Sequence, residues 1–177
     1  MDINFWDFWF KYFYAICVLS GLLTTFITYR RMKAINQGVT NYEINSFIKW
    51  CGICVTVPFM LLQIFQLLGN YRTVFYIFLL DFSNGFYILG FISIILFWTL
   101  VLYLVTIKSG AEIIAKYNKA FRNMPADKTK VKMFIVLMVF AGLIAVLFGN
   151  QIMGGAFANV EANGILKYNE TVKERNG

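Results

Sequence analysis

The sequence predicts an all-α integral membrane protein, a bundle of four transmembrane helices, and three observations support this. Four long apolar stretches cover residues 12–29, 50–68, 86–107 and 131–148, and only Lys132 within them is charged. Each stretch is close to the roughly 17 to 25 residues that a helix needs to cross a bilayer. The composition agrees, because 59% of the residues are hydrophobic and only 14% are charged, against about 25% charged in soluble proteins.

The distribution of basic residues predicts the orientation of these spans. Of the sixteen lysines and arginines, eleven lie in or directly beside the two long loops, residues 30–49 and 108–130. The positive-inside rule places such loops in the cytoplasm, so both termini are expected outside the cell. No loop or tail is long enough to enclose a core of its own. We therefore expect a single transmembrane domain, 1–177, as a multi-pass protein of the inner (plasma) membrane.

The start of the chain and the first span carry two patterns. The aromatic residues between positions 5 and 10 favour a short interfacial helix in the outer headgroup zone. Within the span, Ser20, Thr24 and Thr28 are spaced by four and share one face of a helix. Such a small hydroxylated face is typical of packing against another helix, and it also fits the lining of a pore.

The second span has a clear start and two buried amides. Thr40 and Glu43 have the spacing of a capping box, which predicts a helix from residue 41 onward. Gln63 and Gln66 fall in the outer half of the span, where a side-chain amide must find a partner. They indicate either an interhelical contact or a polar cavity. Cys51 and the cysteine three residues later lack the βαβ context of a redox pair.

The third span is preceded by a break at residues 81–85, because one helix from 74 to 107 would exceed the bilayer thickness. Residues 74–80 are then either interfacial or re-entrant. Asp81 is expected to favour a helix N-terminus or to form an ion site at an outer mouth. The apolar residues Ile113, Ile114, Tyr117 and Phe121 predict that the helix continues into the cytoplasm as an amphipathic extension.

The fourth span carries small residues at every fourth position, Ala141, Ala145 and Gly149. A ridge of this kind lets two backbones approach closely, so we expect it to form the interface of a homo-oligomer. Asn150 and Gln151 follow at the outer end. In a pore they would lie near the outer mouth, as would Asp81, while Gln63 and Gln66 would line the path within the outer half of the bundle.

Several functional classes are disfavoured by what the sequence lacks. It has no histidine, no paired intramembrane carboxylates and no phosphate-binding glycine motif. We therefore expect no catalytic residues, no metal site, no cofactor and no enzymatic activity. The net charge of +7 is concentrated in the two loops, which membrane topology explains without direct nucleic-acid binding.

The basic loops are the remaining candidate for an interaction surface. We expect lipid headgroups or a cytosolic protein to contact a set of their basic residues: Arg30, Arg31, Lys33, Lys116, Lys119 and Arg122. The leading hypothesis is a non-enzymatic membrane subunit that oligomerises and anchors, or signals to, a cytosolic partner. The alternative is an oligomeric ion channel or pore.

In size and four-span layout the chain resembles the small membrane subunits of two-gene bacterial antiphage systems, such as the membrane component of Kiwa. The resemblance is one of architecture and carries no motif. It implies a membrane protein that senses or anchors while a cytosolic partner acts, and hence a role in antiviral defence.

Overall fold

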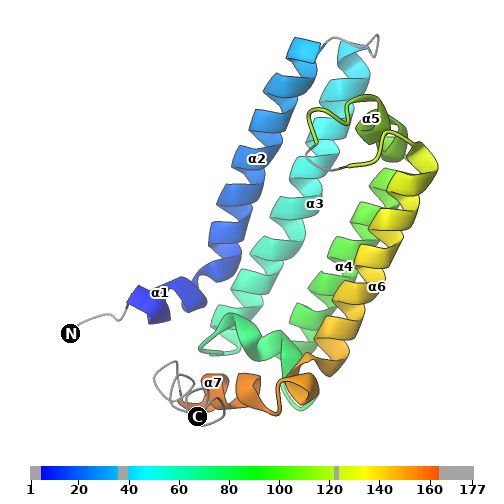
Figure 1. The fold of residues 1–177 in the computed structure, drawn as a ribbon. Helices are drawn as coiled ribbons and strands as arrows, with labels where there is room; N and C mark the ends of the chain where they lie inside the picture. Colours follow the sequence, from blue (N-terminus) through cyan, green and yellow to red (C-terminus); the bar gives the residue numbers. More distant parts are fainter. Residues whose placement is uncertain (1–4, 36–39, 122–123, 164–177) are drawn as a thin grey trace, which may run out of the picture. The chain divides into compact units, whose positions relative to one another are not determined.

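Four long helices dominate the structure (Figure 1). The computed structural model describes residues 5–35, 40–121 and 124–163, and within these ranges the regular structure is entirely helical. The helices long and apolar enough to cross a membrane in this part of the chain are α2 (Phe13–Ile35), α3 (Asn41–Leu68), α4 (Gly85–Thr106) and α6 (Lys128–Ile152). The prediction of an all-helical, four-span protein is confirmed at this level.

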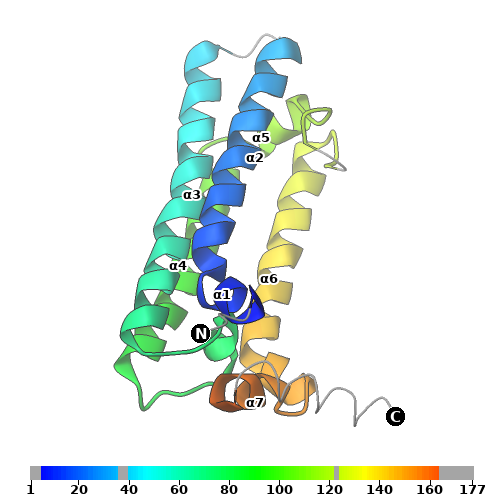
Figure 2. The same cartoon turned by 90° about the vertical axis from the view of Figure 1, so that its left-hand side faces the viewer.

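Four shorter helical segments accompany the spans. They are α1 (Phe5–Lys11), the 3-10 helix η1 (Val74–Phe78), α5 (Gly110–Lys116) and α7 (Ala156–Asn163). The short helix α1 agrees with the prediction made from the aromatic start of the chain. It meets the first turn of α2 at an angle (Figures 1 and 2).

The contacts divide the chain into two compact units, each described by itself below. The terminal unit contains both chain ends and comprises Met1–Ile16, Phe59–Ile94 and Ala141–Gly177. The loop unit contains the connections between α2 and α3 and between α4 and α6, and comprises Cys17–Pro58 and Ile95–Phe140.

Three of the long helices begin at side chains that satisfy free backbone amides. At α3, Glu43 N donates to Thr40 Oγ1 over 3.3 Å and Thr40 N donates to Glu43 Oε2 over 3.0 Å, so the predicted capping box is confirmed. Asn84 Oδ1 accepts from Phe86 N at the start of α4, and Asp127 Oδ1 accepts from Lys130 N at the start of α6, each over 2.9 Å.

At the first basic loop, helix α2 extends past the apolar stretch 12–29 to Ile35, so Arg30, Arg31 and Lys33 lie on its last turns. At the second basic loop, the predicted extension is wrong. The third span does not continue as one extension, because α4 ends at Thr106 and α5 is a separate helix. Ser109 lies between them with a left-handed φ of 56°, a backbone conformation that residues other than glycine rarely adopt.

The loop unit has an apolar core. Ile113, Ile114 and Tyr117, which the extension hypothesis placed on an amphipathic cytoplasmic helix, are each at most 7% exposed in this core. They pack with Met32 of α2, Phe47 and Cys54 of α3, Leu104 and Val105 of α4 and Val131 of α6. The apolar face of α5 therefore packs against the core that α2, α3, α4 and α6 form in this unit. In the same unit, a Cβ on Gly21 would lie 2.5 Å from Val55 Cγ1, which shows how closely α2 and α3 approach.

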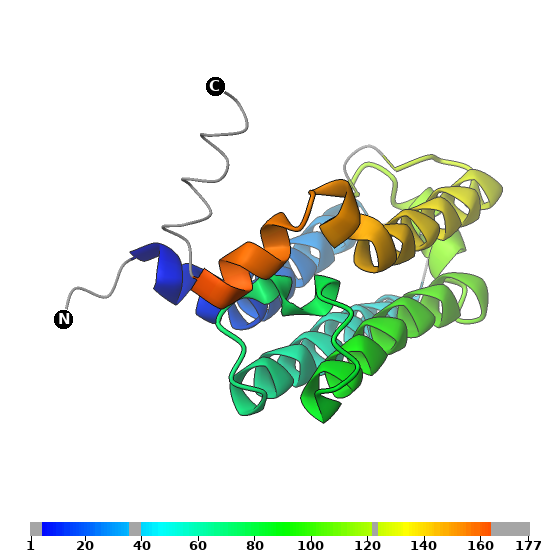
Figure 3. The ribbon, with the colours of Figure 1, turned by 90° about the horizontal axis from the view of Figure 1, so that it is seen from below.

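The terminal unit is built around η1. Helix α7 lies beside η1 (Figure 3), and the rings of Phe75 and Phe157 stack with their centroids 4.6 Å apart. Val74 and Ile77 are buried, as are Ala156 and Val160 on α7. Residues 74–78 are therefore covered by a later helix of the same chain. The sequence predicted the break after them, but it did not reveal that α7 packs against them.

Candidate functional site

The side chain of Gln63 pairs two backbone groups that are left free where the helical hydrogen bonding is interrupted between α1 and α2. In a continuous helix Ala15 N would donate to Lys11 O, the carbonyl four residues earlier. Instead Ala15 N donates to Gln63 Oε1 over 3.1 Å, and Gln63 Nε2 donates to Lys11 O over 2.9 Å. The side-chain amide thus replaces one helical hydrogen bond with two. An inserted side chain is a recognised cause of a helix bend, so the interhelical alternative predicted for this glutamine describes its role.

The other amides of this unit are placed differently. Gln66 is fully buried and its Nε2 lies 3.5 Å from Phe10 O, while its Oε1 has no partner among the described residues. Asn150 Oδ1, on the last turn of α6, accepts from Ala158 N of α7 over 3.3 Å. Gln151 is exposed. Among the described residues, no hydrogen bond links Gln66, Asn150 or Gln151 to Gln63.

Three tyrosines satisfy carbonyl groups around η1. Tyr14 donates to Val74 O over 2.9 Å, Tyr76 donates to Leu62 O over 3.1 Å, and Tyr87 donates to Ile77 O over 3.3 Å. A short 3-10 segment leaves carbonyls that an α-helix would pair, and in an apolar environment each unpaired carbonyl is costly. The hydroxyls therefore stabilise the irregular segment, which sequence patterns did not reveal.

Asp81 organises the turn before α4 instead of capping the helix itself. Its Oδ1 accepts from Ser83 N over 3.1 Å and also from Ser83 Oγ, while the capping position belongs to Asn84. Tyr71 OH lies 3.5 Å from Asp81 Oδ2. Burial, with the negative charge of Asp81 as a second cause, raises the pKa of Tyr71 to about 12. This hydroxyl stays protonated at neutral pH and acts as the donor.

Glu161 is a structurally important residue that the sequence reasoning missed. Its carboxylate accepts from Thr73 N and Thr73 Oγ1, each over 2.9 Å, and also from Arg72 N. Arg72 Nη1 donates in return to Ala162 O over 3.0 Å. The carboxylate therefore holds α7 against the start of η1. No sequence signal links positions 89 residues apart, because the contact depends on how α7 folds back.

The predicted small-residue ridge is only partly free. Ala141 and Ala145 are exposed, but Gly149 lies against aromatic rings of its own chain. A Cβ on Gly149 would lie 3.0 Å from Phe78 Cδ1 and 3.4 Å from Phe157 Cε2. The space beside this glycine is therefore occupied by rings of the same chain. Of the predicted ridge, only the two alanines are exposed to another copy.

The predicted basic contact residues come from two segments of the loop unit. Arg30, Arg31 and Lys33 are exposed near the end of α2, and Lys33 Nζ lies 5.2 Å from the ring centroid of Tyr29. Lys119 is exposed in the segment after α5. Lys116 pairs with Glu112 over 3.4 Å. Arg122 lies outside the described residues. Lys116 and Lys119 do not share a helix, because α5 ends at Lys116.

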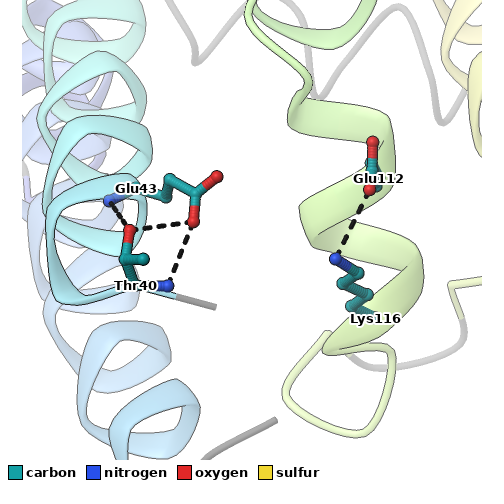
Figure 4. A network of polar contacts seen from close by, with 4 residues as sticks. All are labelled: Thr40, Glu43, Glu112 and Lys116. Atoms are coloured by element: carbon teal, nitrogen blue, oxygen red, sulfur yellow. Dashed lines mark hydrogen bonds and ion pairs between the residues drawn. The ribbon is translucent and has the colours of Figure 1, made fainter. Parts of the chain in front are cut away.

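A pocket of about 190 Å³ lies between the first turns of α3 and the segment from the end of α4 through α5, within the loop unit. We call it the α3–α5 pocket. Its polar lining residues include Glu43, Lys108, Ser109, Glu112 and Lys116, and its apolar lining residues include Phe47, Trp50, Leu104 and Ile113. Figure 4 shows the carboxylate of Glu43 on the side of α3 that faces α5, opposite Glu112 and Lys116.

The remaining candidates for chemistry are sparse in the described part of the chain. No group of three or more histidine, cysteine, aspartate or glutamate side chains that could hold a metal ion occurs there. The three cysteines are free thiols, and Cys54 belongs to the apolar core of the loop unit. Comparison of the chain with protein-family models, with curated proteins and with solved structures finds no match.

Proposed function

We propose that this protein is a non-enzymatic membrane subunit that oligomerises and anchors, or signals to, a cytosolic partner through its basic end. One observation carries the proposal. In the loop unit the apolar residues form the core, while Arg30, Arg31 and Lys119 are exposed and form no ion pair with any described residue. Exposed charges that no described residue pairs with are available to a partner, and they steer association with an acidic surface.

The orientation is part of the proposal. With the basic loops in the cytoplasm, both termini lie outside, as the positive-inside rule requires. Single cysteines placed at position 119 and near the C-terminus, in a chain whose native cysteines are replaced by serine, test this with a membrane-impermeant thiol reagent. The expected result is labelling of the C-terminal site alone in intact cells. Labelling of position 119 from outside contradicts the orientation.

The partner interaction is tested by reversing charge where the side chains are exposed. The variant carries Arg30→Glu, Arg31→Glu and Lys119→Glu, and the control is Lys11→Glu, an exposed lysine in the terminal unit. Proteins cross-linked to the wild type in cells are identified, purified and titrated against both variants at two salt concentrations. The triple variant should lose binding and the control should keep it, and wild-type binding should weaken as salt rises. Equal binding by all three proteins contradicts the proposal.

The alternative of an oligomeric channel or pore has less support. Its strongest candidates were Gln63 and Gln66, but the amide of Gln63 is bonded at both ends to the backbone of the same chain. Recordings in planar bilayers distinguish the two functions. A conductance that Gln63→Leu alters, together with full activity of the triple charge variant, would favour the channel over the anchoring subunit.

A further inference from the structure

The lining of the α3–α5 pocket suits a small group that carries both charges. Two carboxylates, Glu43 and Glu112, and two ammonium groups, Lys108 and Lys116, line a space of about 190 Å³. One water molecule takes up roughly 30 Å³ in the liquid, so a group of several heavy atoms fits. We propose that this pocket binds the headgroup of a zwitterionic phospholipid that has a primary amine, phosphatidylethanolamine. The proposal does not depend on the function proposed above.

The position of the pocket along the spans places it at the level of lipid headgroups. No charged residue occurs from Trp50 to the end of α3, or anywhere in α4, and Lys108 is the first charge after α4. Lys108 Nζ lies 5.8 Å from the ring centroids of both Trp50 and Tyr103. Tryptophan and tyrosine gather at membrane interfaces, and lysine reaches from a helix end toward the polar layer. The pocket therefore opens where the hydrocarbon ends.

The phosphate has a defined set of donors in this pocket. Lys108 forms no ion pair with any described carboxylate, so its ammonium can bind an anionic oxygen. Ser109 lies next to it, and its hydroxyl makes no capping hydrogen bond to α5. One ammonium and one hydroxyl on the same side of the pocket fit the oxygens of a phosphodiester.

Two carboxylates in the lining of the pocket, one from α3 and one from α5, are available to the amine. Glu43 Oε2 accepts from Thr40 N and Thr40 Oγ1, and Oε1 has no hydrogen-bond partner among the described residues. Glu112 is paired with Lys116 through Oε1 over 3.4 Å. A primary ammonium has three N–H donors and can bridge both carboxylates. A quaternary choline group lacks such donors, and a phosphatidylglycerol headgroup would bring no positive charge to them.

The experiment measures lipid selectivity of the full-length protein in detergent. Short-chain phosphatidylethanolamine, phosphatidylglycerol and phosphatidylcholine are titrated in turn, and bound lipid is counted by native mass spectrometry. We expect phosphatidylethanolamine to bind about tenfold more tightly than the other two, since one charge-assisted contact contributes about that factor. Equal affinity for all three lipids overturns the proposal.

Three variants separate a direct contact from a structural effect. Glu112→Gln should weaken phosphatidylethanolamine about tenfold and leave phosphatidylglycerol binding equal or tighter, because a negative charge is removed. Glu43→Gln should act in the same direction while keeping the helix cap, since glutamine also completes a capping box. Lys108→Gln should weaken both lipids, and the exposed Lys130→Gln is the control that should change neither. Parallel loss of both lipids in the two carboxylate variants contradicts the assigned roles.

Free phosphoethanolamine distinguishes a membrane lipid from a soluble ligand with the same chemistry. Trp50 and Leu104 line the apolar side of the pocket, where the glycerol and first acyl carbons of a lipid would lie. Free phosphoethanolamine lacks these atoms and should bind at least about tenfold more weakly than the short-chain lipid. Equal binding of the two compounds shows that the ligand is not a lipid.

Discussion

The terminal unit and the loop unit differ in where they keep their polar side chains. Among the described residues, four polar side chains other than tyrosine are buried, and all four lie in the terminal unit: Gln63, Gln66, Thr73 and Ser93. The loop unit buries an apolar core, and its described charged side chains are exposed except for the half-buried Lys132. Its one buried polar atom without a described partner is Tyr117 Oη, and Gln66 Oε1 is the corresponding atom of the terminal unit.

The difference follows from the backbone of each unit. The terminal unit contains the break between α1 and α2, the 3-10 helix η1, and Asn70 and Leu80 with φ of 55° each. Irregular backbone frees amide and carbonyl groups, and in an apolar environment these must be paired within the protein. Buried amides and hydroxyls in this unit therefore complete the fold. A polar residue in a membrane helix is a functional candidate only after its backbone partners have been considered.

The sharpest way to break this comparison is to remove the inserted amide. Gln63→Leu leaves Lys11 O and Ala15 N without the partner that each now has. Each unpaired buried group costs about 1 to 3 kcal/mol, so we expect a loss of about 3 kcal/mol in the free energy of unfolding. The measurement is chemical unfolding of the purified protein in one detergent.

The control for this change is Gln151→Leu, which makes the same substitution at an exposed position. It should change the free energy of unfolding by less than about 0.5 kcal/mol. If both variants have the same stability, the start of α2 can reform its own hydrogen bond without cost. The inserted amide would then not be needed to hold the terminal unit together.

Regular features of both units could be predicted from the sequence because they depend on local chemistry. The four long helices follow from apolar stretches of sufficient length. The start of α3 follows from the capping box at Thr40 and Glu43, whose three bonds are local. The break before α4 follows from the length of helix that a bilayer can hold and from the polar residues and glycine between positions 81 and 85. In each case the deciding residues are neighbours along the chain.

The features that were missed depend on distant contacts. Ile113, Ile114 and Tyr117 show the same periodicity whether they face solvent at an interface or a core, so the sequence did not reveal that α5 folds onto the loop unit. The need for partners at Gln63 was predictable, but their identity as backbone groups 48 and 52 residues away was not. The role of Glu161 was invisible for the same reason.

A second test compares one substitution at two glycines, one in each unit. A Cβ on Gly90 would collide with the hydroxyl of Tyr76, which is bonded to Leu62 O and whose ring stacks on Tyr71. Because this ring cannot move freely, Gly90→Ala should destabilise the protein by about 2 kcal/mol. Gly52→Ala in the loop unit meets only Leu22 Cδ2 at 3.9 Å, and its better helix propensity should raise stability by up to about 1 kcal/mol.

Thermal unfolding of both variants in the same detergent measures this contrast. The opposite sign at the two positions is the important result, since alanine favours a helix at either place. A gain in stability at Gly90 would show that Tyr76 has room to shift and that the packing around η1 is looser than the contacts indicate.

The smallest expected effect compares two glutamates, and it separates a carboxylate that completes the fold from one that is available to a ligand. Glu161→Ala removes the acceptor of Thr73 N, Thr73 Oγ1 and Arg72 N. The loss should be about 1.5 kcal/mol, because these are hydrogen bonds to a charged but partly exposed group. Glu112→Ala removes only an exposed ion pair to Lys116, four residues away, and should cost about 0.5 kcal/mol at most.

Hydrogen exchange gives the location of each effect: Glu161→Ala should speed exchange at Thr73 and through η1, whereas Glu112→Ala should leave η1 unchanged. Unaltered exchange at Thr73 in the first variant would mean that aromatic packing by Phe157 alone holds α7 on η1, and the contrast between the units would then not extend to this carboxylate.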